Sequence, residues 1–377
     1  MFDVLFSIAI SFAITFLAIP VIITVAEQKK LFDIPDARKV HQSPIPSLGG
    51  LGIFAGFMLA CLIAIPYLAA TDFQYYFAAA FVIFFLGLKD DILVISPIKK
   101  FIGQVLAAFL IIYKGNIQIK SMYGFMGIHE LPEMFSLVLT YLTVIVIINS
   151  FNLIDGIDGL AGSLGLMAST IFGFYFLQVN MLAYSILAFS LAGSLMAFLI
   201  FNFQPAKIFM GDTGSLLVGV VNAILVVKFI SVANQTDIAY PVIASPAISV
   251  AILAIPLMDT LRVFAIRAFN RRSPFSPDRN HVHHLLLDRG FSHRNVTLLL
   301  VSINVLFIIA AYAGRNLGCT WIILSILSVF FAGIAGLYYT RPRTRLFVAK
   351  TMEAPEGELK STKIVPLTTD TILEHKN

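Results

Sequence analysis

The sequence is poor in charge and in cysteine. Only 12% of its 377 residues are Asp, Glu, Lys or Arg, whereas 58% are hydrophobic; an average globular domain has about 25% charged residues. The two cysteines, Cys61 and Cys319, both lie in apolar runs, so no disulfide framework is expected. The scarcity of charged residues excludes a soluble globular protein.

Apolar runs of about 20 residues recur along the chain, and each is long enough to cross a hydrocarbon core of roughly 30 Å. They predict an all-α polytopic membrane protein with about eleven transmembrane helices, and ten or twelve are the alternatives. The first run, Val4–Ala26, lacks a basic segment before it and predicts a helix rather than a cleaved signal peptide. The helices are expected at residues 4–25, 48–70, 74–92, 101–113, 134–150, 160–178, 181–201, 213–232, 242–265, 295–313 and 317–339.

Basic residues predict the orientation, because Lys and Arg accumulate in short cytoplasmic loops. One set of loops, together with the tail, carries 22 of the 26 Lys and Arg residues. We therefore expect the N-terminus outside and the C-terminus in the cytoplasm. The organisation predicted is a single transmembrane catalytic domain at 1–340 and a mobile cytoplasmic tail at 341–377. Cytoplasmic loops at 27–47, 89–100, 149–160, 202–212 and 267–294 would carry the active site. On the outer side, the partial alternation in 115–127 favours a small hairpin.

Acidic residues near the predicted spans lie mostly on the cytoplasmic side. Asp90 and Asp91 end the third segment, where ionised groups are unfavourable unless they are paired or bind an ion or substrate. Lys99 and Lys100 follow before the next helix. The simpler interpretations are a hydrophilic helix end and ordinary positive-inside anchoring.

A second cluster follows a β-branched apolar run and begins at Asn149. Asn152, Asp155 and Asp158 recur every third residue, so in a helix or turn they would line one face. Their oxygens suit a hard cation such as Mg²⁺, or the donor groups of a sugar or base. The alternative is an Asx-rich turn between two helices.

The third cluster runs from Asn202 through Lys207 and Phe209 to Asp212 at the start of the eighth helix. Asp212 could be no more than a helix N-cap. The same position offers free backbone N–H groups to a phosphate, and a carboxylate to the Mg²⁺ that accompanies it.

The fourth cluster lies in a basic inner loop and contains Arg279, His281, His283 and His284. A basic anchor and a zinc site are alternatives, although no cysteine accompanies the histidines. The neighbouring arginines favour an anion-binding surface.

Together these segments resemble the polyprenyl-phosphate N-acetylhexosamine-1-phosphate transferase family. The resemblance runs from about Arg38 to Arg294. Its motifs are Arg38-Lys-Val-His41 with Pro46-Ser-Leu-Gly-Gly50, Asp90-Asp91, Lys100 to Gln104, Asn149 to Gly159, Phe209 to Ser215, and His281-Val-His-His284. The last motif, after Ser-Pro-Asp-Arg279, resembles the GlcNAc-1-phosphate branch, whereas the related phospho-MurNAc-pentapeptide translocase usually has three consecutive histidines.

The resemblance implies transfer of N-acetylhexosamine-1-phosphate, most simply GlcNAc-1-phosphate, from a UDP-sugar to polyprenyl phosphate, with release of UMP and with Mg²⁺ or Mn²⁺ as cofactor. It implies catalytic roles for Asp90, Asp91, His281, His283 and His284, and metal ligation by Asn152 and Asp212. Substrate contacts are implied for Lys100, Asn149, Asp155, Asp158, Asn202, Phe209 and Arg279, with Phe209 stacking on uracil.

The resemblance also implies a multi-pass protein of the cell (inner) membrane, with its active site facing the cytoplasm and no nucleic-acid partner. A homodimer is a further expectation. The alternatives are the pentapeptide translocase activity and a transporter, but a transporter should place its carboxylates near mid-bilayer on broken helices.

Overall fold

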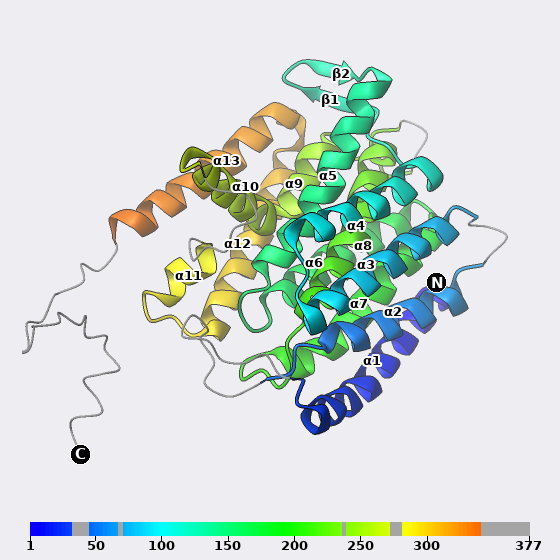
Figure 1. The fold of residues 1–377 in the computed structure, drawn as a ribbon. Coiled ribbons are helices and arrows are strands. Elements are labelled where there is room, and N and C mark those ends of the chain that lie inside the picture. The colour runs from blue at the N-terminus through cyan, green and yellow to red at the C-terminus, as the bar shows by residue number, and fades with distance from the viewer. Residues whose placement is uncertain (32–44, 67–70, 236–238, 272–280, 341–377) are drawn as a thin grey trace, which may run out of the picture. The chain divides into compact units, whose positions relative to one another are not determined.

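The computed structural model describes residues 1–31, 45–66, 71–235, 239–271 and 281–340. Two compact units are present, Met1–Ile334 and Ala335–Asn377. The described part of the second unit is the end of the last helix and Thr340. The site lies in the first unit, which is almost entirely helical (Figure 1).

The helices are α1 (Phe2–Lys29), α2 (Gly49–Ala64), α3 (Phe73–Leu93), α4 (Pro97–Phe109) with a π-helical turn at Leu110–Lys114, α5 (Glu133–Ile154), α6 (Leu160–Gln178), α7 (Leu182–Asn202), α8 (Gly211–Ala233), α9 (Ser245–Ile252), α10 (Ala254–Phe269), α11 (Val282–Leu287), α12 (His293–Ala313) with a 3₁₀ turn at Arg315–Leu317, and α13 (Cys319–Tyr339). All eleven predicted segments contain helix. The ninth is divided into α9 and α10, and α11 was not predicted.

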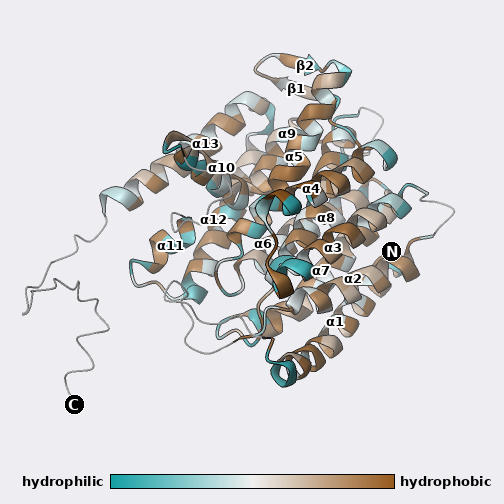
Figure 2. Ribbon diagram, in the orientation of Figure 1, coloured by the Kyte–Doolittle hydropathy of each residue, from teal (hydrophilic) through white to brown (hydrophobic). Residues whose placement is uncertain are grey.

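The predicted class, an all-α polytopic membrane protein, is confirmed. Among the described residues, seven helices are long and apolar enough to cross a membrane, or eight if α9 and α10 form one bent span. They are α1, α5, α6, α7, α8, α12 and α13, and Figure 2 shows their predominantly hydrophobic residues. The count of eleven spans and the orientation remain predictions.

Helix α8 is at the centre of the first unit and packs against α2, α3 and α5. Two glycines allow neighbouring helices to approach its N-terminus. A Cβ added at Gly50 of α2 would lie 2.2 Å from the Gly214 nitrogen, and one at Gly87 of α3 would lie 2.5 Å from the Thr213 Cα. Such contacts require small residues. The first turn of α8 is therefore held firmly, which matters because Asp212 lies in it.

The predicted ninth segment bends by 83° between α9 and α10. A break inside an apolar region leaves backbone groups that must find partners. Asn304 of α12, which is fully buried, supplies them: its Oδ1 accepts from the Ile255 N–H at 2.9 Å and its Nδ2 donates to the Ile252 carbonyl at 2.9 Å. One side chain thus stabilises the bend and the direction of α10.

The hairpin predicted within 115–127 is present slightly further along the chain. Strands β1 (Ser121–Phe125) and β2 (Ile128–Glu130) pair antiparallel, with Ser121 opposite Glu130 and Phe125 opposite Ile128. At its tip, the Met126 N–H donates to Thr320 Oγ1 of α13 at 2.7 Å. The hairpin is thereby attached to the start of α13.

Candidate active site

Polar side chains from four helices meet around Lys100. Its ammonium nitrogen, on α4, lies 3.0 Å from Asp90 Oδ2 of α3 and 2.7 Å from Asp212 Oδ2 of α8. It also donates to Asn152 Oδ1 of α5 at 3.3 Å. Asn152 Nδ2 donates in turn to Asp212 and, at 2.9 Å, to Ser215 Oγ. Candidates from three of the four sequence clusters are therefore in direct contact.

Asp91 has a different environment from Asp90, its neighbour in the chain. Its Oδ1 accepts from the Asp212 N–H at 2.7 Å, and its Oδ2 accepts from the N–H of Thr213, at 3.0 Å, and from the Thr213 hydroxyl. These are the free donors at the start of α8, so Asp91 caps that helix from another helix. Asp90 instead accepts from the Ile95 N–H and faces Lys100.

A cavity of about 310 Å³ lies beside the Lys100 cluster. Asp90 borders it, and Asp91 is not among its lining residues. Its polar wall consists of Asp90, Lys100, Gln104, Asn149, Asn152 and Asp212. Its apolar wall includes Phe101 of α4 and Phe264 of α10. The Lys100 cluster is therefore open to a ligand on one side.

Asn152, Asp155 and Asp158 do not share a helical face, because α5 ends at Ile154 and only Asn152 of the three lies in a helix. The buried Asp158 turns towards α12. Its Oδ1 lies 3.2 Å from His293 Nδ1, and its Oδ2 accepts from the Ala206 N–H at 3.3 Å.

Asp155 lies beyond the end of α5 and faces the other acids. Burial, and then the negative charges of Asp212, Asp91 and Asp158, raise its pKa well above the ordinary value. The charge of Asp155 is therefore coupled to that of Asp212 in the Lys100 cluster.

Two predicted substrate-binding amides are buried and bonded within the protein. Asn202 Oδ1 accepts from the Gly159 N–H at 2.9 Å, and its Nδ2 donates to the Ile208 carbonyl at 2.9 Å. Asn149 exchanges hydrogen bonds with Gln104, at 2.8 and 3.3 Å, yet still borders the cavity. Asn202 thus positions loops, whereas Asn149 remains available to a ligand as well.

The histidine motif is held by α10. Asp259, buried in α10, lies 2.8 Å from His281 Nδ1 through its Oδ2, and its Oδ1 accepts from the Val282 N–H at 3.0 Å. Arg262 donates to the same Oδ1 at 3.0 Å. The start of α11 is thereby tied to α10.

His283 is a buried residue that brings the histidine motif to the second cluster. A Cβ added at Gly156 would lie 2.3 Å from its Nε2, so only glycine fits there. Burial, and then the positive charge of His284, lower the pKa of His283 to about 3. His283 is therefore neutral at pH 7 and supplies no charge to an anion, although the sequence grouped it with the clamp.

Some sequence candidates fall outside the described residues: Arg38, Lys39, His41 and Arg279. Phe209 is described. Its N–H donates to the Pro46 carbonyl at 2.8 Å and its carbonyl accepts from the Gly49 N–H at 2.9 Å. These bonds attach the loop before α8 to the start of α2. Stacking of Phe209 on uracil remains a prediction.

Sequence reasoning missed Asp259, Arg262 and Asn304. A signal was present, since all three are polar residues inside predicted apolar spans, where such residues are rare and usually functional or paired. Asp259 and Arg262 are i,i+3 neighbours on one helix, a spacing that indicates a pair. His281, however, lies 22 residues from Asp259, and Asn304 lies 49 from Ile255, so sequence spacing could not indicate those two contacts.

The Lys100 cluster is chemically suited to a divalent cation. Oxygens of Asp90, Asp212 and Asn152 already surround a positive charge, that of the Lys100 ammonium. Within the described ranges, no group of three His, Cys, Asp or Glu side chains is placed to bind a metal. The two carboxylates and the amide oxygen could hold Mg²⁺, which protein sites usually bind through one or two carboxylates together with substrate phosphates.

Comparison with known proteins identifies the family of this chain. Residues 73–230 match the family model described as glycosyl transferase family 4. This region contains α3 to α7 and most of α8, and hence the whole Lys100 cluster.

Three curated relatives extend the match over most of the chain. The decaprenyl-phosphate N-acetylglucosaminephosphotransferase of Mycobacterium leprae is 34% identical over 76% of this chain and 77% of its own. The probable undecaprenyl-phosphate N-acetylglucosaminyl 1-phosphate transferase of Bacillus subtilis is 31% identical over 87% and 91%. The undecaprenyl-phosphate alpha-N-acetylglucosaminyl 1-phosphate transferase of Yersinia pestis is 31% identical over 80% and 82%.

The fold and site thus define a multi-pass membrane transferase. The chain belongs to glycosyl transferase family 4, in the group of polyprenyl-phosphate N-acetylglucosamine-1-phosphate transferases.

Proposed function

We propose that this protein transfers GlcNAc-1-phosphate from UDP-GlcNAc to a polyprenyl phosphate, releasing UMP. The observation that supports the proposal best is the contact of Lys100 with Asp90, Asp212 and Asn152 beside a cavity of about 310 Å³. These residues come from motifs typical of the family and meet where a cationic centre and a ligand space coincide.

In this reaction an oxygen of the lipid phosphate attacks the sugar-linked phosphorus of the donor. The new P–O bond forms as the bond from that phosphorus to the bridging oxygen breaks, and UMP leaves with the electron pair. Because two anions must meet, positive charge is the main requirement. Lys100 supplies it from a rigid helix, and Asp90 holds the ammonium in place.

The role of Asp90 as a base is not required by the chemistry. A phosphate monoester has a second pKa of about 6 and is largely dianionic at pH 7. Asp90 therefore acts mainly on Lys100, and Asp91 on the first turn of α8. The pair that looks equivalent in sequence has two separate tasks.

Asp212 and Asn152 are the residues that would hold Mg²⁺, or Mn²⁺. Bound there, the ion would neutralise the donor diphosphate and orient it for in-line attack. Lys100 would then turn from Asp212 towards a substrate phosphate, since the ion and the ammonium compete for the same carboxylate.

His281 and His284 with Arg279 are proposed to contact the sugar diphosphate, and Asp155 to contact the nucleoside side. His281 and Asp155 come from segments that meet through His283 and Gly156. The neutral His283 packs between these two segments and is not proposed to bind the anion.

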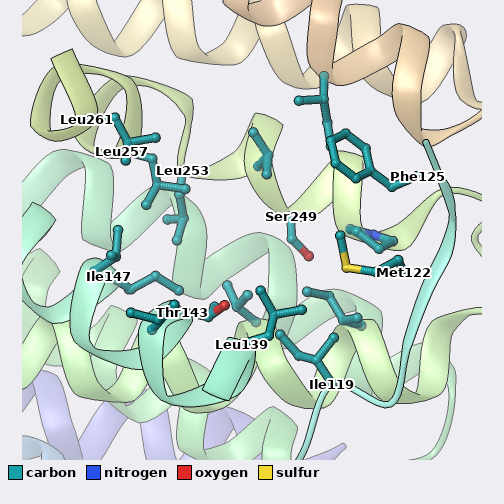
Figure 3. Close-up of a pocket in the computed structure, with 17 residues that line it drawn as sticks. Ile119, Met122, Phe125, Leu139, Thr143, Ile147, Ser249, Leu253, Leu257 and Leu261 are labelled. Carbon is teal, nitrogen blue, oxygen red and sulfur yellow. The ribbon is translucent and has the colours of Figure 1, made fainter. Parts of the chain in front are cut away.

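The polyprenyl chain requires an apolar path, and an apolar cavity of about 380 Å³ is available (Figure 3). Helices α5 and α10 line it through Leu139, Thr143, Leu257 and Leu261. The same two helices border the polar cavity through Asn149 and Phe264. We place the tail along α5 and α10, with its phosphate at Lys100.

The active site is proposed to face the cytoplasm in the cell membrane, where UDP-sugars are found. In a background with the buried Cys61 and Cys319 replaced, a cysteine at Asn280 should react with an impermeant reagent only from the cytoplasmic side. One at Gln235 should react only from outside. The opposite pattern would exclude a cytosolic donor.

The activity is tested with purified protein, undecaprenyl phosphate and a panel of UDP-sugars, measuring UMP release. We expect release with UDP-GlcNAc that requires both the lipid phosphate and a divalent cation. Release only with UDP-MurNAc-pentapeptide would assign the translocase reaction instead. No release with any donor would exclude a transferase.

A further inference from the structure

Asp259 is a buried acid that the proposed reaction does not use directly. It lies in α10 and is 1% exposed. Its two oxygens engage three partners, the His281 ring, the Val282 N–H and the Arg262 guanidinium. A buried carboxylate persists only when its charge is compensated in this way.

The element that carries Asp259 has a fixed direction. Asn304 of α12 bonds both sides of the break before α10, which sets how that helix leaves the bend. Phe264, one turn after Asp259, borders the polar cavity. Because Asp259 ties the start of α11 to α10, it ties it to a helix that lines the polar cavity.

We propose that Asp259 is a positioning residue that fixes the ring of His281 for the sugar-diphosphate donor. An ionised carboxylate only accepts hydrogen bonds, so His281 Nδ1 must be the donor in the 2.8 Å contact. This fixes the orientation of the ring and makes Nε2 the nitrogen that meets the substrate. The bond from the Val282 N–H to Oδ1 fixes the backbone next to the ring as well.

This inference rests on the proposed function for the identity of the ligand, but the effect on the His281 ring is independent of turnover. A purely structural role for the Asp259–Arg262 ion pair would predict a different result. In that case loss of Asp259 would destabilise the fold and reduce activity whether or not His281 is present.

The test compares Asp259→Asn, His281→Ala and the double variant, with Asp288→Asn, at the exposed end of α11, as an acid-to-amide control. Asp259→Asn retains the size of the side chain but removes its charge. We expect kcat/KM for UDP-GlcNAc to fall about 10- to 100-fold in Asp259→Asn. Its KM for undecaprenyl phosphate should stay unchanged, and Asp288→Asn should match the wild type.

In the His281→Ala background, Asp259→Asn should change kcat/KM by less than about 3-fold, because the residue through which it acts is gone. If the two losses multiply instead, Asp259 acts independently of His281 and the inference is wrong. Full activity of Asp259→Asn would overturn it equally. Melting temperature and gel filtration identify any variant that has failed to fold.

A second readout does not depend on turnover. In protein labelled with ¹⁵N-histidine, the His281 resonances, identified by their loss in His281→Ala, should report a proton on Nδ1 in the wild type and a changed pattern in Asp259→Asn. Unchanged resonances would overturn the positioning role. Absence of UMP release from the wild type would overturn the proposed function while leaving this measurement valid.

Discussion

Two polar regions of the molecule are built in different ways. The Lys100 cluster joins α3, α4, α5 and α8, helices of 13 to 23 residues, and its members contact one another directly. The histidine motif lies at α11, a helix of six residues, and depends on Asp259 of α10 for its attachment. A centre built between helices is therefore combined with a clamp on a short helix held by a neighbouring helix, and loss of either should have a distinct effect.

The largest effect is expected in the helical centre. Asp212→Ala removes the carboxylate that contacts Lys100 and Asn152 and would ligate the metal. Without it the diphosphate charge is not compensated, so kcat should fall by at least about 1,000-fold. UMP release in saturating substrate measures this. Full activity of Asp212→Ala in excess chelator would contradict the metal assignment.

The next prediction compares the melting temperature and the activity of variants of the two adjacent aspartates, Asp90 and Asp91. Asp91→Ala removes three hydrogen bonds that cap α8, so the melting temperature should fall by roughly 5 °C and activity with it. Asp90→Ala should leave the melting temperature nearly unchanged while lowering activity, because it frees Lys100 without uncapping α8. Thermal unfolding and UMP release on both variants give the test, and equal melting temperatures would refute the division of tasks.

The clamp should show a smaller loss. His284→Ala removes one charge-assisted contact worth about 1.5 to 3 kcal/mol, so kcat/KM for the UDP-sugar should fall about 10- to 150-fold. Binding of polyprenyl phosphate should be nearly intact, as measured with the lipid alone. Stoichiometric zinc in the wild type, lost in His284→Ala, would restore the zinc interpretation of this loop.

The smallest effect concerns stability and pH. Because burial and neighbouring acids raise the pKa of Asp155, its ionised form is unfavourable in the folded state. Folding then favours the protonated form of Asp155. The residue therefore lowers the free energy of unfolding increasingly as the pH rises from its pKa in the unfolded state to its raised pKa in the folded state. Asp155→Asn should raise the melting temperature at pH 8, and the gain should shrink on acidification. A gain independent of pH would exclude this cause.

The fold and much of the centre could be predicted because they follow from local patterns. Apolar runs predicted α5 to α8 within a few residues, and motif order indicated that Lys100, Asp90 and Asp212 belong together. Asn152 and Asp158 do not share a helical face, because α5 ends between them. The bend before α10 and the roles of Asp259 and Asn304 depend on contacts between distant segments, which single-sequence periodicity does not contain.

The central claim is that the sugar is transferred together with its phosphate. It is tested most directly with UDP-GlcNAc carrying ³²P in the sugar-linked phosphate, incubated with undecaprenyl phosphate, Mg²⁺ and the purified protein. The account predicts label in the lipid product and unlabelled UMP in the aqueous phase. If the label stayed in the aqueous phase as UDP while the sugar reached the lipid without its phosphate, the account would be contradicted.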